Sequence, residues 1–271
     1  MKKGDVVARK SYGKDILFII DRIIRLKNGS AYVILKGLTI RIEADAPIED
    51  IEKVDDIRVS NSEKRIEDIL LERINTYKNE YRSYSIKTGK ILHLDGDRRY
   101  SEKSARYYKK MGLDAIVKNI PESKQPNMVR QLLDKYNPDI LVITGHDAML
   151  KNGMNYSSIY NYRNSKNFIS TVKEARKWAK SSNKLVIFAG ACQSFFEALI
   201  EAGADFASSP GRILIDFIDP LIVAEKVALT DRTKFVSSYE IAREIKEGEK
   251  GIRRHRCDGK KDQSNNHVTK M

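Results

Sequence analysis

Ile140-Leu141-Val142-Ile143-Thr144-Gly145-His146-Asp147 and Leu185-Val186-Ile187-Phe188-Ala189-Gly190-Ala191-Cys192-Gln193-Ser194 are two apolar runs, and each leads into a chemically reactive side chain. Short continuous runs of aliphatic residues are typical of buried strands in a parallel sheet. Ligands of such sheets bind at the carboxyl ends of the strands. The sequence therefore predicts that His146 and Cys192 meet at the edge of the sheet where a site would lie.

Strands and helices alternate on both sides of these two runs, from Ile91 to about Gly248. The pattern predicts strands at residues 91–94, 114–117, 140–144, 185–189 and 206–209, and helices at 101–111, 126–136, 167–181, 193–202, 221–229 and 239–247. Alternation with short loops favours a sheet covered on both faces. The predicted fold class is α/β, with a mostly parallel sheet flanked by helices in residues 89–248.

The N-terminal residues 1–58 have a different pattern, with short β-branched runs at 5–9, 16–20, 31–35 and 39–43. Turn residues separate the runs, and Asn28-Gly29 is a strong hairpin signal. Short strands packed into so few residues predict a small SH3-like β-barrel that precedes the α/β domain.

Two segments join and end these units. Apolar residues recur at helical spacing between residues 62 and 82, so we interpret residues 59–88 as a helical linker, with the domain boundary near 83–89. Apolar content falls sharply after Gly248, and residues 249–271 are predicted to be a disordered basic tail.

Composition excludes several classes of protein. The chain has 271 residues, a formal net charge of +13 and two cysteines. It has no apolar run long enough to span a bilayer and no secretory signal, so we expect a cytoplasmic protein that does not bind membranes. The basic residues are scattered, so nucleic-acid binding is a minor alternative. Without Cys-x-x-Cys or clustered histidines we expect no metal and no cofactor. The oligomeric state stays open.

Cys192 is the candidate nucleophile. It lies between a buried strand and a predicted helix, and a helix N-terminus lowers a thiol pKa and supplies N–H groups to an oxyanion. The alternative is a cysteine that only packs in the core. His146 is the candidate general acid and base, or else a histidine held locally by Asp147. His93 lies within its strand and is expected to be a core residue.

Asp95 and Asp97 follow the first strand of the α/β domain, so they would line the same edge as His146 and Cys192 if that strand is a neighbour. Two carboxylates there could accept a cationic substrate side chain. Turn formation and helix capping are the alternative roles. A Mg²⁺ site for phosphoryl transfer is a weaker alternative, since no phosphate-binding loop accompanies these acids.

At His146 and Cys192 the chain resembles the caspase, legumain, gingipain and clostripain group of cysteine peptidases, in which a histidine ends one strand and a cysteine the next. Over nearly its whole length it resembles the sporulation-specific cysteine proteases of the YabG family. The residues that carry this likeness are 4–12, 92–97, 144–147, 183–184, 188–194 and 204–210.

The resemblance implies a cysteine endopeptidase that processes spore coat and cortex-associated proteins in the mother cell, at the forming coat, and that cleaves after arginine. It implies that Cys192 is the nucleophile and that His146 donates the proton. The backbone N–H of Cys192, together with a backbone N–H near Gly145 or His146, would hold the oxyanion. We place Asp95, Asp97 and Asp147 in the substrate-binding site as candidates. The caspase group usually has glycine after the histidine, whereas this chain has Asp147.

Two alternative functions remain. A glutamine-amidotransferase-like hydrolase also has a cysteine after a strand, but it needs a histidine downstream, where this chain offers only His255 and His267. A non-enzymatic coat or nucleic-acid-binding protein would use the N-terminal unit and the basic tail. Self-cleavage in the tail or in residues 83–90 is a further possibility that the sequence leaves open.

Overall fold

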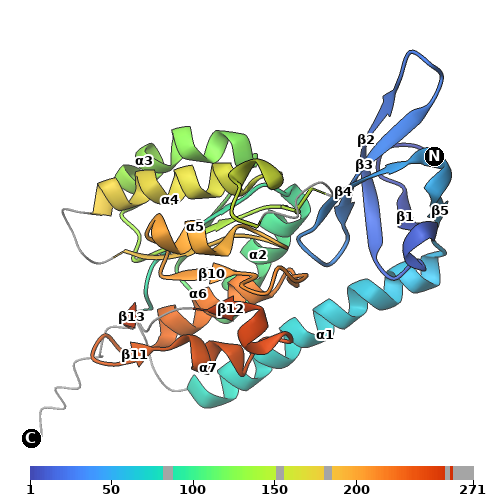
Figure 1. The fold of residues 1–271 in the computed structure, drawn as a ribbon. Coiled ribbons are helices and arrows are strands. Elements are labelled where there is room, and N and C mark those ends of the chain that lie inside the picture. The colour runs from blue at the N-terminus through green and yellow to red at the C-terminus, as the bar shows by residue number, and fades with distance from the viewer. Residues whose placement is uncertain (82–87, 151–155, 180–184, 254–256, 259–271) are drawn as a thin grey trace, which may run out of the picture.

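The structure is a computed structural model that describes residues 1–81, 88–150, 156–179, 185–253 and 257–258. Most of the predicted domain boundary at 83–89 and most of the predicted tail at 249–271 lie outside these residues. In the α/β unit the strands are β6 (Ile91–Asp95), β7 (Ala115–Asn119), β8 (Ile140–Thr144), β9 (Val186–Ala189), β10 (Phe206–Ser208) and β12 (Ile252–Arg253). They form one sheet in the order β12-β10-β9-β8-β6-β7, and all but β12 are parallel (Figure 1). The predicted parallel α/β sheet is confirmed.

Helices cover both faces of this sheet, as its alternating side chains require (Figure 1). Ile140 and Val142 point to one face, and Leu141 and Ile143 point to the other. The first face is covered by α2 (Arg98–Met111), α6 (Asp219–Leu229) and α7 (Ser238–Ala242), and the second by α3 (Gln125–Tyr136), α4 (Ser165–Ala179) and α5 (Phe196–Glu201). Burial on both faces explains why the strands are apolar throughout.

The N-terminal unit is an antiparallel sheet with the strand order β4-β3-β2-β1-β5. The strands are β1 (Val6–Arg9), β2 (Leu17–Arg25), β3 (Ala31–Gly37), β4 (Glu43–Pro47) and β5 (Ile51–Lys53). The predicted SH3-like barrel is not confirmed, because in the described part of the chain no ladder joins the two edge strands β4 and β5.

Residues 39–42 do not belong to this sheet, although the sequence predicts a strand at 39–43. They belong to the loop between β3 and β4, which the Gly37 N–H closes by donating to the Ile42 carbonyl at 2.9 Å, and isolated bridges join Ile40 to Asp216 and Ile42 to Asp147. Both partners belong to the α/β unit. The predicted strand at 39–43 is therefore wrong except at Glu43, where β4 begins, because the alternation of apolar and polar residues carries no information about which unit supplies the hydrogen bonds.

The linker is one long helix, α1 (Asp56–Tyr81), which begins six residues before the predicted stretch and runs beneath the α/β unit (Figure 1). Its apolar positions Ile66 and Ile74 are buried against α2 and α6. Arg73 on the same helix pairs with Glu225 and Glu244, both at 2.9 Å. These contacts tie the linker to the α/β unit along its length.

The chain beyond residue 248 is more structured than the predicted tail. β12 pairs with the edge strand β10, and β11 (Phe235–Val236) pairs with β13 (Cys257–Asp258). Ile252 is 2% exposed and belongs to the main core cluster. The polar average composition of residues 249–271 predicts a disordered tail, but Ile252 alone packs this part of the chain against the core.

Ile252→Ala is therefore expected to lower the free energy of unfolding by about 2–4 kcal/mol, because it leaves a cavity beside β10. Urea denaturation checks this. The exposed Lys250→Ala, two residues away, is the control and should stay within about 0.5 kcal/mol of the wild type. Equal stabilities for both variants would return residues 249–253 to the predicted disordered tail.

Candidate active site

His146 and Cys192 follow neighbouring strands, since β8 and β9 pair in parallel. β6, which ends in Asp95, lies on the other side of β8. The chain order along the sheet reverses here, because β7 lies beyond β6 while β8 and β9 lie on the opposite side. Such a switch point opens a crevice at the carboxyl ends of the strands. The structure thus brings the ends of these three strands together.

Segment 39–43, most of which is the loop between β3 and β4, lies in this crevice and is held there by backbone hydrogen bonds. The Phe217 N–H donates to the Thr39 carbonyl at 3.0 Å, and the Arg41 N–H donates to the Ile215 carbonyl at 3.0 Å. On the other side the Glu43 N–H donates to the Asp147 carbonyl at 3.1 Å. Backbone pairing of this kind is how an extended peptide adds to an existing sheet or loop edge.

The carbonyl oxygen of Arg41 accepts two backbone hydrogen bonds, from the N–H of Cys192 and the N–H of Asp147, each at 3.2 Å. Two preorganised N–H donors that converge on one carbonyl oxygen have the geometry of an oxyanion hole. One donor belongs to the candidate nucleophile, and the other directly follows the candidate histidine. The second N–H therefore comes from Asp147, one or two residues beyond the predicted position at Gly145 or His146.

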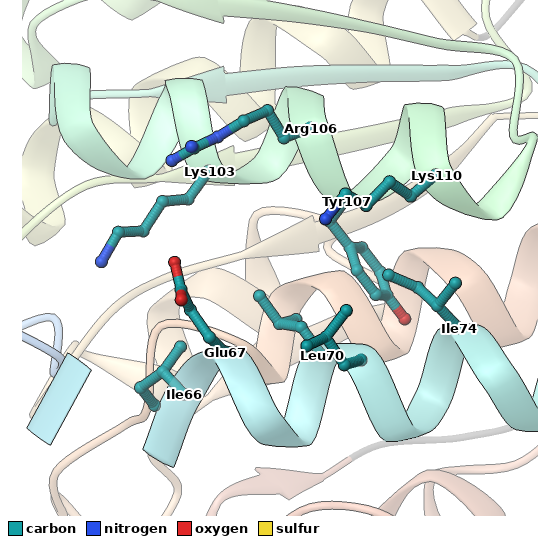
Figure 2. Close-up of a pocket in the computed structure, with 9 residues that line it drawn as sticks. Ile66, Glu67, Leu70, Ile74, Lys103, Arg106, Tyr107 and Lys110 are labelled. Carbon is teal, nitrogen blue, oxygen red and sulfur yellow. The ribbon is translucent and has the colours of Figure 1, made fainter. Parts of the chain in front are cut away.

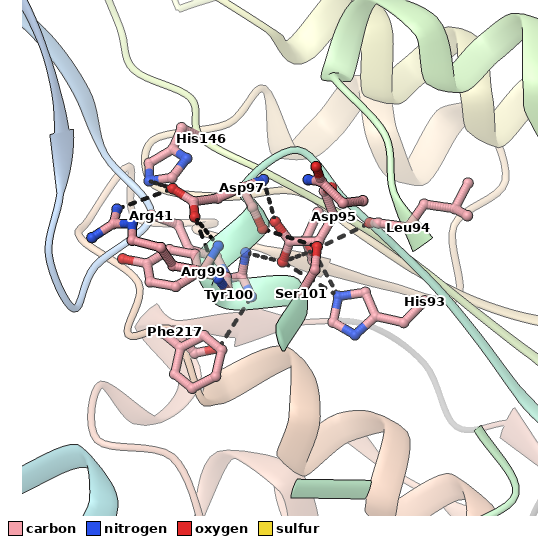
Figure 3. A network of polar contacts seen from close by, with 12 residues as sticks. Arg41, His93, Leu94, Asp95, Asp97, Arg99, Tyr100, Ser101, His146 and Phe217 are labelled. Atoms are coloured by element: carbon pink, nitrogen blue, oxygen red, sulfur yellow. Dashed lines mark hydrogen bonds and ion pairs between the residues drawn. The ribbon is translucent and has the colours of Figure 1, made fainter. Parts of the chain in front are cut away.

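The side chain of Arg41 is fully buried, and its guanidinium Nη1 lies 2.8 Å from Asp95 Oδ2 (Figure 3). Nη2 donates to the Phe217 carbonyl at 3.3 Å. The guanidinium carbon lies 4.9 Å from the centre of the Tyr100 ring and 5.6 Å from that of Phe217. A carboxylate, a carbonyl and two aromatic faces make a pocket whose chemistry matches arginine.

Asp95 is held as a charged group in this pocket. The Asp97 N–H and the Thr144 hydroxyl donate to its carboxylate at 2.8 and 2.9 Å, and His93 Nε2 lies 3.6 Å away. Burial works against the charge, but the Arg41 guanidinium, His93 and the Asp97 N–H together hold the pKa of Asp95 far below its usual value. His93 is buried within the core, as expected.

The Cys192 thiol is fully buried beneath segment 39–43, and its sulfur accepts a hydrogen bond from the Ile215 N–H at 3.0 Å. Burial raises the pKa of Cys192 well above its usual value. The predicted helix at 193–202 is shorter than expected, because α5 begins only at Phe196. Gln193 has a left-handed backbone conformation with φ 54°, which a right-handed helix does not include, and its N–H donates to the Ile213 carbonyl and the Ser209 hydroxyl. The predicted helix start directly after the sulfur is therefore wrong.

The His146 ring stacks on Tyr100 with 5.3 Å between ring centres. Neither ring nitrogen has a hydrogen-bond partner among the described residues, and Nε2 lies 3.9 Å from Asp97 Oδ2. Burial lowers the pKa of His146 to about 3, so the imidazole is neutral in this closed arrangement. Its backbone N–H donates to Glu122 at 2.8 Å, and a Cβ at Gly145 would collide with that carboxylate.

The two other predicted acids have different surroundings. Asp97 caps α2 by accepting from the N–H groups of Arg99 and Tyr100, and it pairs with Arg99 at 3.0 Å. The Asp147 side chain points away from Arg41 and accepts from the hydroxyls of Ser165 and Ser194 at 2.5 and 3.0 Å. It ties the loop after β8 to the loop after β9, while its backbone faces the crevice.

Asp219 is a further buried acid near the pocket, with neither carboxylate oxygen hydrogen-bonded within the described structure. Burial and the nearby Asp216 raise the pKa of Asp219 to about 8. An unfolded aspartate titrates near about 3.9. Between these two values the unfolded chain binds fewer protons than the folded one, so this group lowers stability as the pH rises.

Asp219→Asn removes the titration and is expected to stabilise the protein by about 1 kcal/mol or more at pH 8, with little effect near pH 3, below both pKa values. Urea denaturation at pH 3 and pH 8 measures the difference, and pH 3 serves as the internal control. A gain of equal size at both pH values would contradict the assignment of a raised pKa.

A separate pocket of about 120 Å³ lies between α1 and α2 (Figure 2). Its floor is apolar, with Ile66, Leu70 and Ile74, and Lys103 and Arg106 line its rim. It contains neither His146 nor Cys192, so it plays no part in the arrangement at the sheet edge.

The sequence alone does not identify several residues of the crevice. Arg41 lies in a run that reads as an ordinary strand, and Phe217 and Tyr100 read as core aromatics. Their roles depend on backbone atoms and ring faces, which have no sequence motif. One signal exists: Ile40-Arg41-Ile42 places a lone arginine between two apolar residues in a chain whose resemblance implies cleavage after arginine.

Comparison with known proteins assigns the family. The family described as YabG peptidase U57 matches residues 2–264. The chain is 39% identical over 272 aligned positions to the sporulation-specific protease YabG of Bacillus subtilis (strain 168), which covers 92% of each chain. No solved structure matches significantly. Within the described residues, no helix combines the length and apolarity needed to cross a membrane. The chain thus belongs to the YabG peptidase family and is a sporulation protease.

Proposed function

We propose that this peptidase is a cysteine endopeptidase that cleaves after arginine, with Cys192 as nucleophile and His146 as general acid and base. One observation carries the proposal. The Arg41 carbonyl accepts hydrogen bonds from the N–H groups of Cys192 and Asp147, and the Arg41 side chain forms an ion pair with the buried Asp95. A substrate arginine in the same place would have its carbonyl polarised and its charge neutralised together.

We infer the following chemistry, which requires the Cys192 thiol and the His146 imidazole to approach each other when substrate binds. The Cys192 thiol gives its proton to the neutral His146 imidazole, and the sulfur attacks the carbonyl carbon. The negative charge that develops on the oxygen is stabilised by the two N–H donors. The His146 imidazolium then protonates the departing amine, and water hydrolyses the thioester. Asp97, 3.9 Å from the imidazole, is placed to favour the imidazolium during the step.

The specificity part of the proposal rests on Asp95. Its carboxylate is fully buried, and a buried unpaired charge is costly, so the empty pocket favours an occupant with a positive charge. The flat faces of Tyr100 and Phe217 suit a planar guanidinium better than an ammonium. Arginine should therefore be preferred over lysine.

The biological part of the proposal concerns substrates and place. The relative's description as a sporulation-specific protease supports substrates made during spore formation. We infer that these are coat and cortex-associated proteins, processed in the mother cell at the forming coat. We infer that such substrates enter by a loop that pairs with both sides of the crevice, and the backbone hydrogen bonds of segment 39–43 with Phe217, Ile215 and Asp147 support this mode of entry.

A peptide series tests the activity. Otherwise identical fluorogenic peptides with arginine, lysine or the neutral isostere citrulline before the cleaved bond are offered to the wild type and to Arg41→Gln, which empties the pocket. We expect kcat/KM for arginine to exceed that for citrulline by about 100-fold or more, because the isostere leaves Asp95 unpaired. Equal rates for the three peptides, or none with any, would refute the proposed specificity or activity.

A further inference from the structure

We propose that the groove between α1 and α2 is a docking site for an acidic, amphipathic segment of a protein substrate. The groove is the pocket of about 120 Å³ described above, and it is separate from the crevice (Figure 2). Docking itself does not depend on the proposed arginine specificity. Its effect on cleavage rests on the proposed function, so binding and cleavage are measured separately.

The floor of the groove is apolar and comes from α1. Ile66 and Ile74 are 1% and 4% exposed. Leu70 is partly buried between them, and Leu71 is 45% exposed. A cavity of about 150 Å³ holds a molecule the size of benzene, whereas pockets for drug-sized ligands have about 300–1,000 Å³. The groove therefore suits one apolar side chain of a protein better than a small-molecule ligand.

The opposite wall is cationic and comes from α2. Lys103, Arg106 and Lys110 are three and four residues apart, which places them on one face of the helix. Lys103 pairs with Glu63 at 3.4 Å, but Arg106 and Lys110 form no ion pair within the described part of the chain. Like charges four residues apart in a helix repel each other. An anionic occupant would relieve this repulsion, so the unpaired cations point to acidic side chains.

The charge of the chain argues against an internal occupant. The segments outside the described residues each carry a net positive charge: 82–87, 151–155, 180–184, 254–256 and 259–271. The whole chain has a net charge of +13, so a second copy that met the groove with the same surface would be repelled. The occupant that matches the cationic wall is therefore an acidic segment of another protein.

An anionic membrane shares the preferred charge but not the shape. Ile66 and Ile74 lie on the floor between two helices and are almost fully buried, so a flat bilayer cannot reach them. A protein segment that inserts a side chain into the groove can reach them. Amphipathic helices bind grooves in this way, with apolar anchors three or four residues apart. The shape of the groove therefore favours a protein segment over a lipid surface.

Helix α2 connects the groove to the crevice. Tyr100, near its start, packs on the Arg41 guanidinium, and Tyr107, seven residues later, lines the groove. With a rise of about 1.5 Å per residue, Lys103 lies about one turn beyond Tyr100, and Lys110 lies about 15 Å beyond it. A docked segment would therefore hold the rest of a substrate beside the crevice and raise its effective concentration there.

A hollow next to the groove indicates the side from which a substrate would reach it. Ser62 and Arg65 of α1 line this hollow together with Thr39 of the crevice segment. Thr39 lies two residues before Arg41, which occupies the arginine pocket. We therefore expect the docking segment of a substrate to precede its cleaved arginine.

Fluorescence anisotropy of a labelled probe peptide tests the docking. The probe is an amphipathic helix of about 18 residues, with leucine at every third or fourth position and glutamate elsewhere. The full-length Cys192→Ala variant is the receptor. We expect binding that weakens as salt is added. A probe with glutamine in place of glutamate, and a scramble of the same composition, should each bind about tenfold more weakly or worse.

Two pairs of variants separate the groove from the rest of the surface. Arg106→Glu should weaken probe binding by about tenfold or more, because an attraction becomes a repulsion. Its control, Lys109→Glu, makes the same charge change at an exposed residue of α2 outside the groove lining. Leu71→Asn should also weaken binding, and its control, Ile57→Asn, changes a 74% exposed residue of α1. Both controls should stay within about twofold. Circular dichroism confirms that each variant is folded.

A pair of arginyl peptides measures the effect on cleavage by the wild type. They carry the probe segment or its scramble before the arginine, joined by a Gly/Ser linker of about ten residues. We expect the intact segment to lower KM by about tenfold with similar kcat, because docking raises the local concentration of the peptide without changing the chemical step. In Arg106→Glu the two peptides should have equal KM.

The outcomes separate the docking site from the proposed function. Equal affinity for probe and scramble, or no effect of Arg106→Glu and Leu71→Asn, would overturn the docking site. So would Arg106-dependent binding of phosphatidylglycerol vesicles by a protein that does not bind the probe. Hydrolysis of both arginyl peptides with equal KM would overturn substrate capture and leave the proposed function standing. Probe binding without hydrolysis of either peptide would overturn the proposed function and leave the docking site standing.

Discussion

Cys192→Ala is expected to lower kcat/KM for an arginyl peptide by at least about 10³-fold, because the remaining oxyanion donors and binding contacts supply only residual catalysis. The backbone N–H of residue 192 is kept, so substrate binding should change little. The effect should therefore appear in kcat rather than KM. Progress curves with the fluorogenic peptide, at enzyme concentrations high enough to detect the residual rate, measure it.

The second cysteine provides the control for this prediction. Cys257→Ala should keep wild-type activity, since its backbone pairs with β11 at a separate two-stranded sheet. His146→Ala should reproduce the loss seen for Cys192→Ala, and the double variant should be no worse than either, because the two groups act as a unit. Full activity in Cys192→Ala would remove the cysteine mechanism and leave only the family assignment.

Asp95→Asn is the prediction with the second largest effect. It breaks the fully buried ion pair with Arg41 and leaves a guanidinium without its counter-charge. Removing one partner of a buried pair typically costs about 3–5 kcal/mol. We expect a loss of that size in the free energy of unfolding, measured by urea denaturation in the Cys192→Ala background, which lacks the proposed nucleophile.

The same substitution should also erase the preference for arginine over citrulline in the peptide series. Asp97→Asn is the matched control, because Asp97 lies at the same edge but caps α2 and pairs with Arg99. It should cost about 1 kcal/mol of stability and keep the arginine preference. The sequence treats the two acids as equivalent, so equal effects on specificity would contradict the pocket built on Asp95.

The Asp95 charge also gives stability a defined pH dependence. Its folded pKa lies far below that of an unfolded aspartate, which is about 3.9. The stabilisation is therefore fully present above about pH 4 and is lost progressively as the pH falls toward the folded pKa. This direction is opposite to that of Asp219, whose raised pKa lowers stability as the pH rises. Asp95→Asn should reduce the loss of stability below about pH 4, whereas the effect of Asp219→Asn should grow as the pH rises from about 4 to about 8.

Much of the α/β unit is predictable from the sequence, because its signals are local. The runs at Ile140 and Leu185 are apolar at every position, which is typical of strands buried on both faces, and both are strands of the parallel sheet. Helix α2 ends at Met111 before the glycine stop Gly112, as predicted, but it is capped by Asp97 and begins at Arg98, three residues before the predicted start at 101. Parallel pairing then places His146 and Cys192 at the same edge.

The predictions that the structure contradicts or does not confirm depend on contacts between distant residues. The SH3-like barrel required a decision about whether β4 and β5 meet, and short strands and turn residues do not encode that pairing. The helix after Cys192 begins later than predicted because Gln193 has a left-handed backbone conformation, which its hydrogen bonds to Ile213 and Ser209 accompany. Ile252 is buried by β10 and its neighbours, although the composition around it resembles a solvated tail.

The sequence by itself determined the alternation of strands and helices and the positions of one histidine and one cysteine after two adjacent buried strands. Hydrophobic period and turn chemistry are properties of neighbouring residues, so one chain read in order reveals them. Only the tertiary structure decided that Arg41 lies at the ends of these strands, where its guanidinium pairs with Asp95 and its carbonyl accepts hydrogen bonds from two backbone N–H groups. Those contacts join residues more than fifty positions apart through backbone atoms that every residue possesses, and no local pattern distinguishes them.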